Sequence, residues 1–482
     1  MQHGTSKTRI IQGYWLSLWA LLLGLVSGCA TGPSTPSSLE LPRGPMPEIR
    51  YVVEAVRVEG NTKTSSSLIE SLVDLPQGRP VSVQELEPLK RRLLGTGYFS
   101  GVEARLDRGS ERGRVVVVIE VEERNTIILS DIILGSSREH PFWGGLDVAE
   151  GNLFGRGLVL GGAFVVGEGQ SGFRGQLADP FAFLAPLRLS SEVHHVSADE
   201  AFYTRGSEVG GESEAGRLRS TRTGGEVGLG FYPLALLGVF VDVGVEGIEA
   251  SSTAPTLMAP WLRDGRSFNR YLRLTLDHDT RDDPLVPRSG YRLNVSLQAG
   301  DPTWGSSYSY LKAVLRTSYY QALAFGAVGH VLRFDLFGGT IVGDAPYHER
   351  FFVGDVSSLV ASRDLSMSFS ARPSPDFFDR GAGDLGYETV MAGAGVEYGV
   401  PIMQGPAPFY RVEFFIGTGV FGMTTPGDLP GLRAANLGID ALGTSRPTVF
   451  PVDLTFDVGF RAETPIGVFG LSFGNGLALV GF

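Results

Sequence analysis

Two short runs of residues carry side chains that could bind a metal ion. The pair His194-His195 and the run Asp277-His278-Asp279 hold imidazole and carboxylate groups, which are common ligands of divalent cations. In an extended strand, Asp277 and Asp279 share one face while His278 points to the other, so the three do not converge on one ion. We assign the pairs to a strand end and a turn, and expect no metal, no cofactor and no Ser-His-Asp catalysis. The protein is not predicted to be an enzyme.

Cys29 is the only cysteine of the chain and follows an export signal. Lys7 and Arg9 precede an apolar run from Tyr14 to Val26, the pattern of a secretory signal. The run leads into Val26-Ser27-Gly28-Cys29, which resembles a bacterial lipobox, whose cysteine is lipidated and becomes the mature N-terminus. This resemblance implies a signal peptide over residues 1–28 and a lipid anchor on Cys29. Residues 29–49 are rich in Ser, Pro, Thr and Gly and are expected to form a flexible tether.

The composition favours a β protein. The chain has 482 residues, enough for one large domain and an accessory domain. Its 66 glycines recur within alternating segments, and helices disfavour so much glycine. After the N-terminus no apolar run approaches the ~20 residues that a membrane helix needs. The net charge is −11, with no Lys/Arg-rich block, so nucleic-acid binding is not expected.

Residues 50–124 predict a small α/β domain in the order β-α-α-β-β. Tyr51 to Glu59 alternates as a strand, and Ser65 to Leu75 carries leucines at helical spacing. A second helix is expected over Pro80 to Gly95, with Ser82 as its N-cap and Glu85 completing a capping box. Two strands complete the domain, at Val102 to Leu106 and Arg114 to Glu122.

Residues 126–482 alternate apolar and polar side chains in segment after segment. Val241, Val243 and Val245, for example, alternate with Asp242, Gly244 and Glu246. The same rule governs Val452 to Glu463, near the end of the chain. In a transmembrane barrel the apolar face meets lipid and the polar face lines a wet lumen. Roughly 355 residues accommodate an antiparallel barrel of about sixteen strands.

Long polar or Gly/Pro-rich stretches between the alternating segments are expected to be surface loops. They are Ser197 to Thr223, Glu249 to Ser267 and Ala345 to Gly386. Aromatic residues near predicted strand ends would suit the interfacial girdles of a barrel. These are Phe181, Trp261, Tyr291, Trp304, Tyr319 and Tyr320.

Several motifs resemble one family throughout the chain. "VRVEGN", "GYFSGVEARL" and "VVVVIEVEE" are similar to a POTRA domain, and the barrel segments are similar to the BamA/TamA outer-membrane assembly superfamily. The matching turn residues are Gly155 and Gly157 in "GNLFGRG", Asp179 and Pro180 in "ADPF", and Pro287 and Gly290 in the mid-barrel turn. "GFRAETPIGVFGLSFG" resembles the last hairpin, and Phe482 resembles the C-terminal assembly signal.

The lumenal loop departs from the family pattern. The family carries a Val-Arg-Gly-aromatic tip there, and its Arg pairs with an acidic residue on the barrel wall. Here Val360 and Ala361 occupy the Arg and Gly positions, while Arg363 follows three places late. Glu397 occupies the matching wall position. We predict that Arg363 pairs with Glu397; the alternative is that Arg363 is solvated and the loop is degenerate.

The resemblance implies a lipid-anchored outer-membrane barrel with its POTRA domain in the periplasm, acting in insertion or translocation of other proteins. POTRA domains offer a strand edge to client chains, and the barrel seam between about Thr126 to Leu134 and Val468 to Phe482 would template an incoming strand. Expected partners are outer-membrane lipids, unfolded or secreted polypeptides and periplasmic accessory proteins. Three alternatives remain: a secretion pore for one dedicated partner, a passive channel or structural barrel, and a surface-exposed scaffold.

Overall fold

A computed structural model describes most of the chain from Ile49 onward. The described residues are 49–135, 142–182, 187–205, 212–234, 236–252, 263, 265–283, 286–324, 329–352, 387–405, 409–424, 452–464 and 467–477. Residues Met1–Ile49 form one unit and Arg50–Phe482 a second. Cys29, Val360, Ala361, Arg363 and Phe482 lie outside the described residues. Among the helices that are described, none has the length and apolar character to cross a bilayer.

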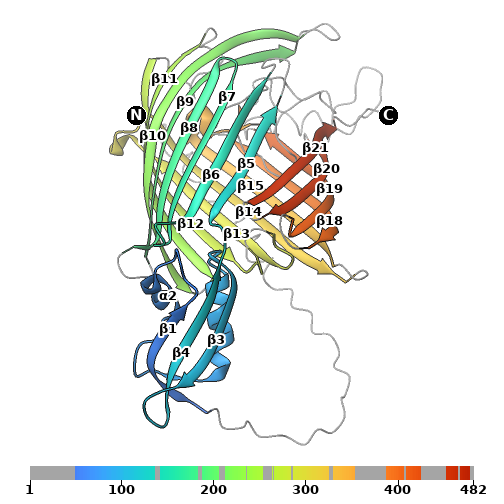
Figure 1. The fold of residues 1–482 in the computed structure, drawn as a ribbon. Helices are drawn as coiled ribbons and strands as arrows, with labels where there is room; N and C mark the ends of the chain where they lie inside the picture. The colour runs from blue at the N-terminus through green and yellow to red at the C-terminus, as the bar shows by residue number, and fades with distance from the viewer. Residues whose placement is uncertain are drawn as a thin grey trace, which may run out of the picture. The chain divides into compact units, whose positions relative to one another are not determined.

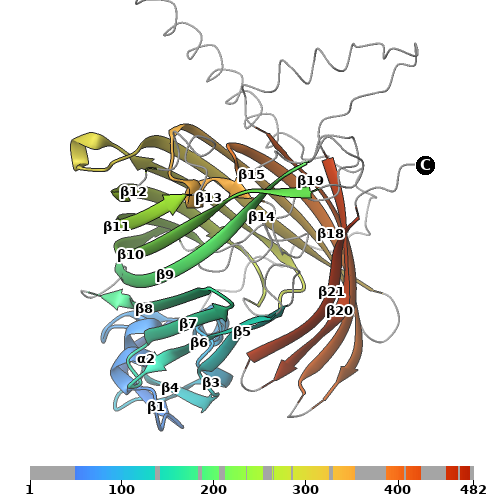
Figure 2. The same ribbon diagram turned by 90° about the horizontal axis from the view of Figure 1, so that it is seen from above.

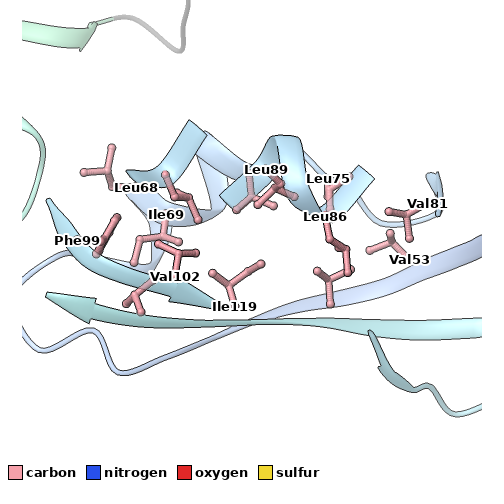
Figure 3. Close-up of a cluster of buried hydrophobic side chains, with 14 of the residues drawn as sticks. Val53, Leu68, Ile69, Leu75, Val81, Leu86, Leu89, Phe99, Val102 and Ile119 are labelled. Atoms are coloured by element: carbon pink, nitrogen blue, oxygen red, sulfur yellow. The ribbon is translucent and has the colours of Figure 1, made fainter. Parts of the chain in front are cut away.

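The first domain of the second unit is a four-stranded sheet covered by two helices. Its elements are β1 (Tyr51–Glu59), α2 (Ser66–Val73), β2 (Pro80–Val81), η1 (Val83–Glu85), α3 (Leu86–Leu94), β3 (Phe99–Arg108) and β4 (Arg114–Glu123). The sheet order is β2-β1-β4-β3, with β1 parallel to β4. Ile69 and Leu86 on the helices pack against Val102 and Ile119 of the sheet in one apolar core (Figure 3). The predicted small α/β domain is therefore confirmed.

The predicted second helix begins later than its sequence suggests. Pro80 and Val81 form a short edge strand that pairs with Val52 and Tyr51, and Val81 is completely buried. Proline suits an edge strand because its missing N–H removes no interior ladder bond. Ser82 makes no side-chain capping bond, so the predicted cap is wrong. The α-helix starts only at Leu86, after a 3-10 turn.

The remainder of the unit is one antiparallel sheet of fifteen strands in the described residues, where about sixteen were predicted. The strands are β5 (Ile127–Gly135), β6 (Trp143–Leu153), β7 (Leu158–Gly167), β8 (Gln170–Ala182), β9 (Leu187–Arg205), β10 (Glu212–Leu234), β11 (Leu237–Ser252), β12 (Gly265–Asp279), β13 (Gly290–Gly300), β14 (Ser309–Leu323), β15 (His330–Asp344), β18 (Val390–Gln404), β19 (Arg411–Thr424), β20 (Val452–Thr464) and β21 (Gly467–Leu477). Every neighbour in the ladder is a neighbour in sequence order, apart from the step from β15 to β18. Figures 1 and 2 show the sheet curving round, so that β5 and β21 face each other.

The sheet buries its polar face and exposes its apolar face. Val243 and Ile416 are 56% and 53% exposed, whereas Asn269 is 0% exposed and Glu246 is 3% exposed. A protein surrounded by water shows the opposite distribution. The exposed side chains therefore meet lipid, and the polar side chains line the lumen of a transmembrane β-barrel. The predicted fold class is confirmed.

Parts of two predicted surface loops are strand. Most of Ser197 to Thr223 belongs to β9 and β10, whose ladder continues through Ser197↔Thr221 and beyond. Cross-strand ion pairs support this extension, since Asp199 accepts hydrogen bonds from Arg217 and Arg219. The ends of Glu249 to Ser267 are also strand, in β11 and β12.

Candidate functional site

A buried carboxylate, Glu246 on β11, is the centre of a polar cluster in the lumen. It accepts a hydrogen bond of 3.0 Å from Arg222 Nη1 on β10. Its oxygens lie 3.0 Å from His194 Nε2 on β9 and 2.7 Å from His348 Nε2. A carboxylate that is only 3% exposed needs such partners, because an unpaired buried charge costs several kcal/mol. Glu246 thus ties three neighbouring strands to a segment from elsewhere in the chain.

That segment is the start of the long connection after β15, and it folds into the lumen. It contains η3 (Tyr347–Glu349) and β16 (Phe351–Phe352), which pairs with β17 (Tyr387–Glu388). Tyr347 is 1% exposed, and its hydroxyl lies 2.5 Å from Ser220 Oγ. Glu349 accepts bonds of 2.7 Å from Lys312 Nζ and from Gln298 Nε2. We call residues 345–352 the lumenal segment; the prediction that they belong to a surface loop is wrong.

The lumenal segment is held by packing as well as by charge. Ala345, Tyr347 and Phe351 join a buried apolar cluster with side chains from β10, β11, β14, β15 and β18. A polar cavity of about 440 Å³ adjoins the segment, and its lining includes Arg222, Glu226, Tyr271, Arg273, Arg316 and Glu349. The segment therefore fills part of the lumen between these strands and leaves a polar cavity beside it.

A second buried ionic cluster lies on the wall formed by β18, β19 and β20. Glu397 is 4% exposed and accepts bonds of 3.1 Å and 3.2 Å from Arg461 Nη2. Arg461 Nη1 also donates to Glu413, at 3.1 Å, and Glu413 pairs with Arg411. The guanidinium of Arg461 stands 4.7 Å from the centre of the Phe415 ring. Glu397 thus has a cationic partner on the wall itself, and the proposed pairing with Arg363 stays a prediction.

The residues weighed as metal ligands have other partners. His194 lies on the lumenal side beside Glu246, while His195 Nδ1 lies 2.8 Å from Thr223 Oγ1. Both are in mid-strand, not at a strand end or turn as predicted. Asp277 accepts a bond of 2.9 Å from Arg292 Nε, and Asp279 one of 2.7 Å from Arg281 Nη2. In the described part of the chain, no three His, Cys, Asp or Glu side chains form a possible metal site.

The chain also contains a sequence pattern that catalytic serines use. Residues 470–474 read Gly-Leu-Ser-Phe-Gly, which fits Gly-x-Ser-x-Gly. A nucleophilic serine in that motif sits on a sharp turn between a strand and a helix. Here Ser472 lies within β21 and is paired with Gly459 of β20. The backbone context does not fit a nucleophile elbow.

The "GNLFGRG" turn between β6 and β7 contacts the small α/β domain. Asn152 Nδ2 donates a bond of 2.9 Å to Thr64 Oγ1, and Ser65 N donates one of 2.9 Å to Gly155 O. Gly155 has φ +67°, and a Cβ there would stand 1.9 Å from Lys63 O. Gly157 also has positive φ, at +73°, and its nitrogen donates to Asn152 Oδ1. At Gly155, glycine is thus required by both backbone conformation and close approach. We call this contact the joint.

Glu123, at the end of β4, organises the other side of the joint. Its carboxylate accepts from the backbone nitrogens of Thr62, Lys63 and Thr64, at 2.9, 2.9 and 2.6 Å, and from Thr62 Oγ1 at 2.5 Å. Partial burial acts to raise the pKa of Glu123, but these donors outweigh it and lower the pKa to about 2. A cavity of about 340 Å³ lies at the joint, and its lining includes Glu123, Arg124, Asn152 and Phe154.

The other family turn residues occupy constrained backbone positions. Asp179 and Pro180 lie in β8, where the register with β9 shifts. Gly290 has φ +95°, and a Cβ there would lie 2.3 Å from Thr280 O. Pro287 belongs to the same β12–β13 turn, in which Asp282 Oδ1 accepts from the backbone nitrogen of Arg288. These residues shape turns and strand ends.

The two ends of the sheet form a seam. β5 and β21 close the strand order, and no ladder joins them among the described residues, although some of their Cα atoms come within 8 Å. On β21, Gly470 and Gly474 are paired with Arg461 and Asp457 of β20. Directly paired residues point to the same face, so glycine occupies the lumenal register of the last strand.

Comparisons with known proteins agree with this architecture. Residues 152–475 match the Omp85 superfamily domain, and residues 51–124 match the surface antigen variable number repeat of POTRA type. The chain is 26% identical over 356 residues to outer membrane protein assembly factor BamA of Nitratidesulfovibrio vulgaris. This alignment covers 72% of the chain but 41% of the relative, so the chain spans about two fifths of that protein.

Three solved structures share the fold. BamA from Haemophilus ducreyi lacking POTRA domains 1–3 has a TM-score of 0.53 at 15% identity, over 89% of this chain and 81% of that one. CdiB from Acinetobacter baumannii has a TM-score of 0.52 at 10% identity, with 89% and 70% covered. CdiB from Escherichia coli has a TM-score of 0.51 at 10% identity, with 99% and 96% covered. The predicted family is confirmed: the chain belongs to the Omp85 superfamily, as an outer-membrane β-barrel preceded by a POTRA domain.

Proposed function

We propose that this protein inserts or translocates other polypeptides at the outer membrane by pairing their strands with its open seam. The observation that carries the proposal is the sheet whose first and last strands approach without a described ladder between them. An unpaired strand edge presents backbone N–H and C=O groups to any extended chain that reaches it. Strand pairing needs no catalyst or cofactor.

The composition of β21 supports an opening at this seam. Gly470, Gly474 and Gly476 weaken a strand interior, because glycine has no side chain to pack and loses much entropy on ordering. Gly470 and Gly474 therefore place no side chain in the lumen next to their partners Arg461 and Asp457. An incoming strand would meet a smooth surface on the lumenal side and lipid on the other.

The POTRA domain would deliver the client. Its sheet ends on one side at β3, whose outer edge has no partner strand among the described residues. Such an edge can add an extended peptide by β-augmentation. The joint holds this domain against the β6–β7 turn, next to β5 in the sheet order. We place the domain in the periplasm and propose a lipid anchor at Cys29, which would keep the N-terminus at the same membrane.

A dedicated secretion pore is the second candidate. The CdiB structure from Escherichia coli aligns with 99% of this chain over 96% of its own length, whereas the BamA relative is matched over 41%. A passive channel is less favoured, because the lumenal segment fills part of the barrel interior.

Depletion of the protein, followed by quantification of the outer-membrane and secreted proteomes, separates these roles. Loss of many unrelated barrels supports general assembly, and loss of one secreted protein supports a dedicated pore. A panel of cysteine pairs across β5 and β21 then tests the seam itself, with cysteine pairs across β13 and β14 as the matched control. Oxidation of the cysteine pairs across the seam should block insertion or secretion of client proteins. Reduction of the disulfides should restore it. Full activity with an oxidised seam would refute the mechanism.

A further inference from the structure

An arginine-rich patch lies on the outer face of β12, beyond its apolar side chains. Leu272, Leu274 and Leu276 are 41%, 37% and 40% exposed, which makes even-numbered positions of this strand the lipid-facing ones. Arg266, Phe268 and Arg270 continue the same face toward the start of the strand and are all exposed. Along one face, the side chains thus change from aliphatic to cationic and aromatic.

The patch lies at the end of the barrel that is remote from the POTRA domain. β12 runs from Gly265 to Asp279, and Asp279 N donates to Leu236 O in the β10–β11 turn. Adjacent strands of this sheet are antiparallel, so the β10–β11 turn is at the same end as the β6–β7 turn of the joint. With the POTRA domain in the periplasm, as proposed above, Arg266 and Arg270 lie toward the outer leaflet.

Two guanidinium groups flank one aromatic ring. Arg266 Cζ lies 5.6 Å, and Arg270 Cζ 5.8 Å, from the centre of the Phe268 ring. Arg270 Nη1 donates to Trp304 O at 3.1 Å, and Trp304 is 45% exposed. Stacking on an aromatic ring orients a guanidinium while leaving N–H groups directed outward. The side chains are positioned as a pair of fork-shaped donors.

Acidic neighbours compensate this charge only in part. Glu249 of β11 is paired with Arg266 in the ladder, but the ionic distance is 3.6 Å and both side chains are largely exposed. Exposed pairs of this kind contribute little. No acidic partner of Arg270 appears among the described hydrogen bonds and ion pairs. The patch therefore keeps a positive charge at the depth where lipid headgroups begin.

We propose that Arg266 and Arg270 bind the phosphate groups of an anionic lipid in the outer leaflet. Guanidinium pairs with phosphate in a bidentate geometry, and the aliphatic row of Leu272 to Leu276 would lie beside the acyl chains of the same lipid. The continuity of cationic and aliphatic surface on one strand face favours a lipid over a free ion. Phe268 and Trp304 suit the interface between the lipid headgroups and the acyl chains.

Titration of the purified full-length protein in detergent with diphosphorylated lipid A tests the proposal, with retained lipid counted by native mass spectrometry. Each arginine at a membrane surface accounts for about a fivefold gain in affinity, so R266Q/R270Q should bind about 25-fold more weakly. R266K/R270K keeps the positive charge and should lose less lipid affinity than R266Q/R270Q. R57Q/R108Q removes two exposed arginines from the POTRA domain and is the matched control.

Three results would overturn the assignment. Wild-type affinity in R266Q/R270Q would show that the patch does not bind the lipid. Equal binding of dephosphorylated lipid A would show that phosphate is not recognised. Displacement of lipid A by an equal concentration of inorganic phosphate would show that a free anion suffices. All three variants change only exposed side chains, and heat-modifiable migration on gels verifies that the barrel is folded.

Discussion

Replacement of Glu123 by glutamine should loosen the joint without unfolding the barrel. The carboxylate gathers four donors from Thr62, Lys63 and Thr64, and Thr64 in turn accepts the bond from Asn152 of the β6–β7 turn. Glutamine keeps one oxygen but turns an NH₂ group toward the remaining donors. Loss of charge-assisted bonds of this kind costs more than loss of neutral ones.

The magnitude follows from the pKa of Glu123, which falls from 4.5 to about 2 in the folded chain. A shift of this size corresponds to ~3 kcal/mol, and solvent screening of a partly exposed group reduces it to about 2 kcal/mol. Because the folded pKa is depressed, this stabilisation is present above the unfolded pKa and is lost as the pH falls through about 2. E123Q should therefore remove, at pH 7, the stabilisation that protonation of Glu123 removes from the wild type at low pH.

Hydrogen exchange of the full-length protein in detergent measures the effect. Amides of residues 62–64 should exchange about 30-fold faster in E123Q than in the wild type at pH 7, since 1.4 kcal/mol is tenfold. Glu122 is exposed on the neighbouring position of β4, so E122Q is the matched control. Unchanged exchange in E123Q, or equal acceleration in both variants, would refute the role assigned to Glu123.

Three further perturbations test the other parts of the site. R461A removes the cationic donor of the buried Glu397 and leaves Glu413 with Arg411 alone, so it should destabilise the barrel by about 3–5 kcal/mol, seen as a lower temperature of heat modification on gels; an unchanged temperature would contradict the wall cluster. E246Q weakens the anchor of His348, and should raise single-channel conductance in planar bilayers; identical conductance would mean that the lumenal segment is held by packing alone. G155A forces a Cβ to 1.9 Å from Lys63 O and should expose the joint to protease, whereas G338A, where a Cβ meets nothing, should not.

Alternation predicted the two faces of each strand, because period two assigns successive side chains to opposite faces before any pairing is known. It did not predict the partner of Glu397. Register places Arg461 across from Glu413, and the same guanidinium also reaches Glu397 on β18. A single sequence does not reveal the register between strands, so the pairing of Glu397 with Arg461 could not be predicted from it.

Loop boundaries failed for a related reason. Residues 197–223 are polar on both faces, as in a loop, but Asp199, Arg217 and Arg219 pair across two strands and continue the ladder. The lumenal segment, residues 345–352, was assigned to a surface loop. Tyr347, His348 and Glu349 look like ordinary loop residues until the barrel supplies Ser220, Glu246 and Lys312 as partners.

The lumenal segment gives the barrel a mechanical asymmetry. Its bonds to β10, β11, β13 and β14 brace one side of the wall internally, in addition to the ladder between those strands. The opposite side ends in a glycine-rich strand that carries no described ladder to β5. A load applied to the wall deforms its most compliant element first. Widening of this barrel would therefore concentrate at the seam, and the braced strands would move as a rigid shell.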